Sequence, residues 1–508
     1  MDKRLKYLFI FTLIFLTLFL RFLWLDHAIL EGDMFRDLTI ATNITEGHLR
    51  LAGITAGTSE FSNQQSFGPI MYYIIAVLIL ISKNPLFVVG FIALINSIAV
   101  LLTYLFCKKY FSEKIALFAS ILYAVNPWAV YMSDIFWNPN FLPIFSILLF
   151  YSIFKFIIEK KDWALIILTF IIAIMLHFHL TPLFYLIILG LSMLLFRRDV
   201  KNKYYFYSLI SFIIPFIPFI YFNLKHGYSL LGPILYGTTR ESNSFFTSLI
   251  ESIGIPVMLG TNYLGKYVYG NSFIFYNKIF YYYLFLITIL LVFLFILGLF
   301  YLLILMKKNT KFNNQNKQTK YYLIFFIFVI PIMLHFLRFS NISPHYYFMI
   351  YPIQFIIYGF IFEKLFNKFK ILSIIIILII VFSNILSIYA LHNYIEKNGS
   401  TKGGEFSISY KNKIEVMDFI ENNSDNNYKI VYYGRSYKSF NYLFNLRKNN
   451  YEYVALNSTE QIAKFKGYYL ILDRISYHRT ILNDNETNYF NNLKEHYKIG
   501  SVDVYKIK

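Results

Sequence analysis

The chain has 508 residues, of which 57% are hydrophobic and only 15% charged, and this composition excludes a soluble domain of that size. We therefore interpret it as a polytopic protein surrounded by membrane lipids. Its formal net charge of +19 does not indicate a nucleic-acid partner, because most basic residues fall in short loops between apolar runs, where the positive-inside rule accounts for them. The single cysteine, Cys107, excludes an intrachain disulfide and any multi-cysteine metal site.

About eleven apolar runs are candidates for membrane-spanning helices. They occupy residues 7–25, 87–106, 114–132, 141–158, 163–178, 181–196, 204–222, 280–306, 320–338, 345–362 and 370–391. A span takes about 20 residues, and somewhat fewer where neighbouring helices and local thinning of the bilayer help. The first run is followed by no small-residue cleavage site, so we expect a retained span rather than a signal peptide.

A further apolar run at 67–81 is ambiguous, and the distribution of basic residues decides its interpretation. Lys and Arg are concentrated near the start of the chain and in the loops at 108–114, 159–161, 197–203, 307–320 and 364–370, all of which should therefore be cytoplasmic. This assignment requires that a single crossing separates 26–86 from the loop at 108–114. We therefore expect 67–81 to form a juxtamembrane or half-inserted helix on the outer side, opened by Pro69 in its first turn.

These expectations define a fold class and a topology. The sequence predicts a polytopic α-helical protein of the cell membrane with about eleven transmembrane helices, a juxtamembrane helix and a cytoplasmic N-terminus. After a membrane module of residues 1–392, the composition changes to Asn, Lys, Tyr and Ser, and no run is long enough to cross. Strands are expected at 429–433 and 468–472 and helices near 411–421 and 459–465, so residues 393–508 should form a small extracytoplasmic α/β domain.

Polar segments with little Lys or Arg gather on the expected outer face, at 26–66, 133–140, 177–182, 223–279 and 338–345. The first of them carries three carboxylates and an arginine directly outside the first span, at Glu31, Asp33, Arg36 and Asp37. Charge placed against a bilayer is costly, and it commonly marks a functional site.

Several short motifs occur in a fixed order along the chain, at 32–37 (Gly-Asp-Met-Phe-Arg-Asp), 68–73 (Gly-Pro-Ile-Met-Tyr-Tyr), 137–140 (Trp-Asn-Pro-Asn), 225–227 (Lys-His-Gly) and 345–346 (His-Tyr). In this order the chain resembles the membrane-embedded, C-type glycosyltransferases of family 39, which include protein O-mannosyltransferases and the aminoarabinose transferases that modify lipid A. The resemblance covers roughly residues 1–390. It is nearest to the bacterial and archaeal relatives of that group.

The resemblance implies a hexosyl- or pentosyltransferase. Its donor would be a polyprenyl-phosphate sugar, and its acceptor a lipid, a glycan or a protein on the outer face of the membrane. A juxtamembrane helix in the first outer loop is also a feature of the class, in agreement with the charge argument. Met34 stands where the family carries a glutamate, so the role of that glutamate is missing here or is supplied by Glu31 or Asp37.

Sugar transfer from a phosphate to a hydroxyl passes through a transition state with oxocarbenium character, and inversion requires a base on the face opposite the leaving phosphate. We expect Asp33 to be this base, since partial desolvation at the interface can raise the pKa of a carboxylate toward the working pH. The alternative is that Asp33 only caps the helix that follows it. Arg36 and Asp37 share its helical face, where they position substrate or phosphate, or else form a local ion pair.

The leaving phosphate needs cationic or hydrogen-bonding groups at the outer interface. Candidates at the outer ends of spans are Lys225, His226, Arg338, His345 and Tyr346. The alternatives are that Lys225 merely extends its amine toward water and that His345 and Tyr346 belong to an interfacial aromatic belt.

The second outer loop contributes Asp134 and Asn138, which are candidates for positioning substrate or a cation. Related transferases place an acidic motif at that loop, although the relatives nearest in pattern often carry a basic residue instead. The alternative for residues 137–140 is a simple turn, since Pro139 restricts the residue before it and can open the next helix.

The sequence predicts no metal site and no required cofactor, and it leaves dependence on a divalent cation open. His177 and His179 do not have the spacing of a structural zinc site. The competing function is a flippase for lipid-linked glycans, but transporters often show repeats and charges at mid-membrane depth. A glycan ligase should carry an arginine-rich outer loop, whereas 223–279 contains only Arg240.

Overall fold

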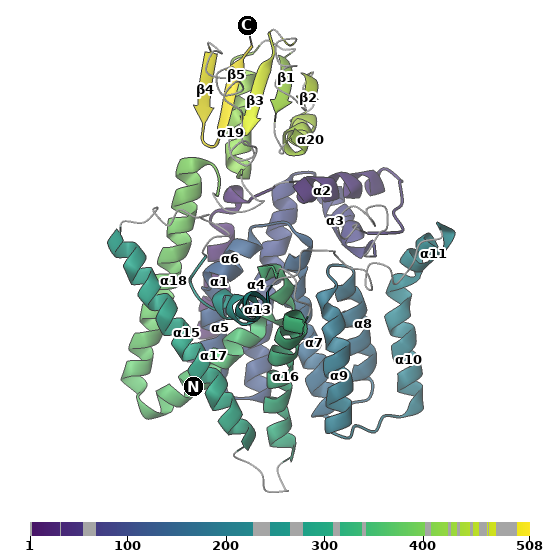
Figure 1. Ribbon diagram of the computed structural model, residues 1–508, viewed down its shortest axis with the longest axis vertical. Helices are drawn as coiled ribbons and strands as arrows, with labels where there is room; N and C mark the ends of the chain where they lie inside the picture. The colour runs from purple at the N-terminus through teal and green to yellow at the C-terminus, as the bar shows by residue number, and fades with distance from the viewer. Residues whose placement is uncertain are drawn as a thin grey trace.

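The structure is a computed structural model, and it describes the chain in segments. These are residues 3–30, 32–53, 68–226, 244–264, 278–307, 315–337, 342–401, 408–424, 428–433, 437–447, 451–456, 465, 467–473 and 495–507. Figure 1 shows a bundle of helices with the C-terminal sheet above one of its ends.

Every predicted span coincides with a helix or with two helices in succession. The helices of residues 1–392 and the turns that extend them are α1 (Lys3–Phe22), η1 (Leu25–His27), α2 (Gly32–Thr45), α3 (Ile70–Ile81), α4 (Pro85–Tyr110), α5 (Glu113–Ala124), α6 (Pro127–Ser133), η2 (Asn138–Phe141), α7 (Leu142–Ile157), α8 (Ala164–Leu176), η3 (Thr181–Leu183), α9 (Phe184–Leu195), α10 (Asn202–Ile213), η4 (Ile214–Phe216), α11 (Ile217–Lys225), α13 (Phe245–Leu259), α15 (Lys278–Lys307), α16 (Gln315–Leu337), η7 (Pro344–Ile350), α17 (Tyr351–Lys368) and α18 (Lys370–Asn398).

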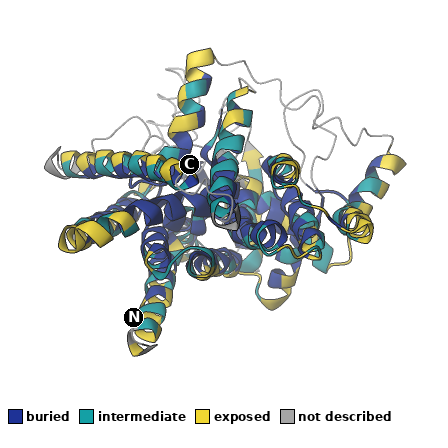
Figure 2. Ribbon diagram, turned by 90° about the horizontal axis from the view of Figure 1, so that it is seen from below, coloured by how far each residue is buried: buried dark blue, intermediate teal, exposed yellow. Residues whose placement is uncertain are grey.

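Within the described segments, seven helical stretches are long and apolar enough to cross a membrane, or up to eight if the pair α5 and α6 is one span. The predicted spans at 163–178 and 181–196 correspond to the shorter apolar helices α8 and α9. Large apolar side chains on α15 are exposed, among them Phe285, Phe293 and Phe300, as expected for a helix that faces lipid. Figure 2 shows buried residues concentrated along the centre of the bundle and exposed residues on its outlying helices. A multi-pass membrane architecture follows, while the total of eleven spans and their orientation remain predictions.

The predicted span at 114–132 is broken between α5 and α6, which meet at 56°. Pro127 has no backbone N–H and disfavours helical geometry at the residue before it, so the helix cannot run through this point. Asn126 restarts it as the N-cap of α6, since its Oδ1 accepts a hydrogen bond from the backbone N–H of Ala129 at 2.9 Å. Tyr351 donates a second bond to that oxygen, which ties the bend to α17.

The ambiguous apolar run forms the twelve-residue helix α3, with Pro69 at its N-cap. A helix of that length is about 18 Å long, too short for a hydrocarbon core of about 30 Å. Figure 1 shows α2 and α3 together at the end of the bundle nearest the sheet. This placement agrees with the juxtamembrane helix expected from the sequence.

The C-terminal part contains a five-stranded sheet in the order β2-β1-β3-β5-β4. Its elements are α19 (Tyr410–Asn422), β1 (Tyr428–Tyr433), α20 (Tyr437–Arg447), β2 (Tyr451–Leu456), β3 (Tyr469–Asp473), β4 (Glu495–Ile499) and β5 (Val502–Lys506). β1 lies parallel to β2 and β3, whereas β5 is antiparallel to β3 and β4. The predicted strands and the predicted helix near 411–421 are β1, β3 and α19. The helix expected at 459–465 falls outside the described residues, apart from residue 465 itself.

This small domain docks directly on the segment that leads into α2. Tyr410 donates its backbone N–H to the carbonyl of Ala28 at 2.8 Å, and Ile29 forms a bridge with Ser409. Lys413 is fully buried and donates its amine to the carbonyl of Leu30. The start of α2 is therefore held by α19, although α19 lies far along the chain.

Candidate active site

The first turn of α2 presents Asp33, with 59% of its side chain exposed. α2 begins at Gly32, so Asp33 lies inside the first turn rather than at the N-cap. The φ of Gly32 is +33°, a value that is unfavourable for residues other than glycine. Among the described contacts its carboxylate accepts from Arg36, with 2.7 Å between Asp33 Oδ1 and Arg36 Nη1. A carboxylate in this turn is also favoured by the helix dipole.

Arg36 lies between two carboxylates of very different exposure. Its Nε is 2.8 Å from Oδ1 of Asp37, whose side chain is only 2% exposed. Burial raises the pKa of Asp37 to about 6, against the opposing effect of the Arg36 charge. The guanidinium of Arg36 thus contacts the buried carboxyl group of Asp37 on one side and the exposed carboxylate of Asp33 on the other.

Asp37 also accepts a hydrogen bond at 3.3 Å from the hydroxyl of Tyr72, on α3. This contact joins the motif at 32–37 to the motif at 68–73, which the sequence separates by some thirty residues. The start of α3 in turn contacts the end of α8, where the backbone N–H of Ile70 points to Nδ1 of His177 at 3.5 Å. A Cβ at Gly68 would lie 1.9 Å from the His177 ring, so any side chain there would have to displace that ring.

A second group of rings gathers His345 and Tyr346 from η7 with Trp137 and His179. The ring centroids of Trp137 and His345 are 4.4 Å apart, and those of His179 and Tyr346 are 5.3 Å apart. Asn138, next to Trp137, donates its side-chain amide to the carbonyl of Phe178 at 2.5 Å and so holds the motif at 137–140 against the turn after α8. The structure therefore brings Asn138, His345 and Tyr346 together, as members of one cluster.

His335 belongs to the same cluster and was not among the predicted residues. Its ring stacks on that of Tyr346, with centroids 5.5 Å apart, and it is 1% exposed. The sequence could have indicated His335, because it is an ionisable residue inside the apolar run at 320–338, where apolar side chains are usual.

Asp134 lies elsewhere, at the C-terminal end of α6 and fully inside the protein. Its Oδ2 is 3.6 Å from Nε2 of His392 on α18, and Arg21 of α1 contributes an attractive charge. Burial raises the pKa of Asp134 well above its usual value. Nδ1 of His392 lies 3.3 Å from Nδ1 of His27, and Nε2 of His27 lies 2.7 Å from the carboxylate of Glu396. The described contacts make Asp134 a link between α6 and α18, and they do not join it to Asp33.

The remaining predicted residues are not brought to either cluster by the described parts of the chain. Lys225 and His226 are exposed at the end of α11, which Figure 1 shows at one edge of the molecule, away from α2 and α3. Arg338 and Glu31 lie outside the described residues. Met34 is 1% exposed and faces the core, so the side chain at the position of the family's glutamate does not accompany Asp33.

No group of three or more His, Cys, Asp or Glu side chains that could hold a metal ion occurs within the described segments. The predicted absence of a metal site stays a prediction. Among the described residues, the polar groups linked to Asp33 are the Arg36 guanidinium, the Asp37 carboxyl group and the Tyr72 phenol.

Comparisons with known proteins bear on this arrangement. Residues 66–222 match the family model of the dolichyl-phosphate-mannose-protein mannosyltransferases, a stretch that includes the motifs at 68–73 and 137–140. No curated protein matches the chain in sequence. Among solved structures, ArnT from Cupriavidus metallidurans bound to undecaprenyl phosphate is similar over 99% of this chain and 98% of its own, with 10% identity and a TM-score of 0.59.

An oligosaccharyltransferase from Archaeoglobus fulgidus, in complex with zinc and sulfate, matches 98% of this chain and 73% of its own at 10% identity, but its TM-score is only 0.49. The similarity of fold is therefore that to ArnT. The chain shares the fold of ArnT and, over residues 66–222, matches the mannosyltransferase family model, which confirms its resemblance to the membrane-embedded, C-type glycosyltransferases of family 39.

Proposed function

We propose that this protein transfers a sugar from a polyprenyl-phosphate carrier to an acceptor on the outer face of the membrane, with inversion and with Asp33 as general base. The observation that carries the proposal is the exposed carboxylate of Asp33, held by Arg36 on the buried carboxyl group of Asp37. The fold shared with ArnT, whose structure holds undecaprenyl phosphate, supports a lipid-linked donor. The family match over residues 66–222 supports glycosyl transfer.

In the proposed step the acceptor hydroxyl attacks the anomeric carbon of the sugar. A new bond forms between the hydroxyl oxygen and that carbon while the bond from the carbon to the phosphate oxygen breaks, and polyprenyl phosphate leaves with the electron pair. The hydroxyl proton passes to Asp33, whose exposure leaves it accessible to an acceptor. Arg36 positions the carboxylate, and Asp37 supplies the second acidic group in place of the family's glutamate, since Met34 is turned into the core.

The cluster of Trp137, His179, His345 and Tyr346 is the proposed location for the phosphate of the donor. Imidazole N–H and phenolic O–H groups can donate to a phosphate on which charge develops as the sugar departs. The link from α3 through His177 to the turn that carries His179 joins this cluster to the Asp33 group. Inversion requires that the donor phosphate and the base lie on opposite sides of the reacting carbon.

The test uses the full chain in lipid nanodiscs with a mixed pool of polyprenyl-phosphate sugars and an acceptor extract. Release of free polyprenyl phosphate is followed by mass spectrometry. We expect release by the wild type and a loss of at least about 100-fold in Asp33→Asn, the scale typical of a general base. Asp26→Asn, which alters another exposed carboxylate a few residues earlier, is the matched control and should behave as the wild type.

Equal release by wild type and Asp33→Asn would remove Asp33 from the mechanism. No release by the wild type from any donor in the pool would count against the transferase and would direct attention to transport of the same lipids.

A further inference from the structure

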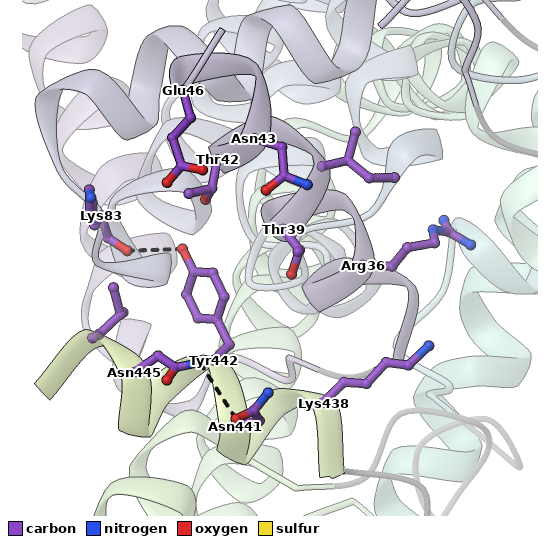
Figure 3. A pocket seen from close by; sticks show the side chains of 12 residues that line it. Arg36, Thr39, Thr42, Asn43, Glu46, Lys83, Lys438, Asn441, Tyr442 and Asn445 are labelled. Atoms are coloured by element: carbon purple, nitrogen blue, oxygen red, sulfur yellow. Dashed lines mark hydrogen bonds between the residues drawn. The ribbon is translucent and has the colours of Figure 1, made fainter. Parts of the chain in front are cut away.

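A groove separates α2 from α20 of the C-terminal domain, beside the α3–α4 connection. Its volume is about 580 Å³, within the range of about 300 to 1,000 Å³ that is usual for small-molecule sites. Figure 3 shows side chains from both helices facing the same space. α2 contributes Arg36, Thr39, Thr42 and Asn43, the turn after it contributes Glu46, and α20 contributes Lys438, Asn441, Tyr442 and Asn445.

The groove follows one face of α2. Arg36, Thr39, Ile40 and Asn43 recur at the spacing of successive helical turns, so they form a continuous strip. The opposite face of the helix is apolar and buried, at Met34, Phe35, Leu38 and Ala41. Packing therefore explains the apolar face of α2, whereas its polar strip faces the groove.

The chemistry of the lining favours a ligand rich in hydroxyl groups. Asn side chains both donate and accept hydrogen bonds, as sugar hydroxyls do, and the hydroxyls of Thr39 and Thr42, which donate to carbonyls of α2, can still accept. Tyr442 of α20 lies half-buried in the groove. Its hydroxyl donates to the carbonyl of Lys83 at 3.4 Å, and this contact closes the groove on the side of the α3–α4 connection. The Tyr442 ring, Ile40 and Leu446 offer apolar surface to the C–H faces of a sugar ring.

The charges argue against a phosphate ligand. The lining has three basic side chains, Arg36, Lys83 and Lys438, and one acidic side chain, Glu46. Arg36 is already paired with two carboxylates, and Lys83 and Lys438 lie at opposite sides of the groove in Figure 3, so the positive charge is not concentrated at one point. Phosphate recognition uses concentrated positive charge with bidentate donors, which this lining does not offer. Much of the lining surface is apolar, but polar side chains interrupt it on both helices, and an acyl chain would leave those groups without hydrogen-bond partners.

The groove also leads toward the candidate base. Arg36 lines the groove and at the same time holds Asp33, with 2.7 Å between Arg36 Nη1 and Asp33 Oδ1. A chain of sugars lying along α2 would thus bring a hydroxyl at its end to the exposed carboxylate.

We propose that this groove binds the acceptor, and that the acceptor is a glycan. The inference rests on the proposed transferase function, and it selects the glycan from the lipid, glycan and protein acceptors that the sequence left open. The C-terminal domain then contributes to catalysis by recognising the acceptor, through the side chains of α20.

The test measures binding without any donor. Trisaccharides of glucose, mannose and N-acetylglucosamine are titrated against the full chain in nanodiscs and followed by saturation-transfer NMR. Asn43→Ala removes an exposed amide that has no side-chain hydrogen bond within the described residues, so its fold should be unaffected. One lost hydrogen bond should weaken binding about 5-fold. Thr39→Trp, which fills the groove with an indole, should abolish binding.

Asn422→Ala is the matched control, because Asn422 is an exposed asparagine on α19 that does not line the groove. It should bind as the wild type does, and so should Asp33→Asn. The same trisaccharide should serve as acceptor in the carrier-release assay for the wild type and for Asn422→Ala, and should fail with Thr39→Trp.

The two proposals fail in different ways. If no trisaccharide binds, or if Asn43→Ala and Thr39→Trp bind as tightly as the wild type, the groove is not the acceptor site, whatever the release assay shows. If binding depends on Asn43 but the wild type releases no carrier, the transferase function and the acceptor role both fall, and only a carbohydrate-binding groove remains.

Discussion

Replacement of Asp37 by Asn tests the electrostatic basis of the candidate site. The amide keeps an oxygen that can accept from Arg36 and Tyr72, so the change removes mainly the negative charge. Burial raises the pKa of Asp37 to about 6 from the usual 3.8. The folded state therefore binds the proton more tightly than the unfolded state does, and stability that is fully present below pH 3.8 is lost as pH rises through 6.

The size of this loss follows from the two pKa values. Between pH 4.5 and pH 7 the wild type should lose about 2 kcal/mol of unfolding free energy relative to Asp37→Asn. With an unfolding entropy of about 2.1 cal/mol/K per residue, this corresponds to about 2 °C in Tm for a chain of 508 residues.

The assay is thermal unfolding in detergent at both pH values, followed by tryptophan fluorescence. Asp26→Asn, at an exposed carboxylate, is the control and should follow the wild type. If the difference in Tm between wild type and Asp37→Asn is the same at pH 4.5 and pH 7, Asp37 ionises like a solvated carboxylate, and the argument from its burial is wrong.

Two glycines give further predictions. Gly298→Ala would place a Cβ 2.8 Å from the backbone oxygen of Ile357, where α15 meets α17, and overpacking of this kind costs about 1 to 3 kcal/mol. Its Tm should fall, whereas Gly190→Ala, which has open space at its Cβ within α9, should leave Tm unchanged or raise it by about 1 °C through helix propensity; equal effects would refute the close packing of α15 and α17. Gly68→Ala should displace the His177 ring and reduce carrier release at least 10-fold with unchanged helical content by circular dichroism, and wild-type activity in this variant would show that His177 has no part in shaping the site.

Much of the helical architecture could be predicted because long apolar runs in a membrane protein have few alternatives to helix. The helix α3 was predicted to be juxtamembrane from the distribution of Lys and Arg over all the loops of the chain, and not from the local sequence of residues 67–81. The bend before α6 was missed, although Asn126 followed by Pro127 carries the cap and first-turn signal for a new helix. The helix α20 was also missed, although Phe440, Leu443 and Phe444 recur at helical spacing.

The candidate site was predictable only where its contacts are local. Asp33 and Arg36 pair because three residues on a helix bring side chains together, and this spacing is visible in the sequence. The contacts of Asp37 with Tyr72 and of Asp134 with His392 join segments that are distant in the chain, so they depend on how the helices pack. Asp134 was assigned to the outer loop from its position after a span, and no local signal indicated that α18 would cover it.

The boundary predicted at residue 393 falls inside α18, which continues to Asn398, and the C-terminal domain that follows this helix packs directly against α2. Lys413 reaches from α19 to the carbonyl of Leu30, and its amine lies 5.3 Å from the centroid of the Phe35 ring on α2. A buried amine is tolerated only where its donors are satisfied, so this contact fixes α19 against the start of α2. Because the same helix α2 carries Asp33 and forms one wall of the groove, any motion of the C-terminal domain must change the groove and the surroundings of Asp33 together.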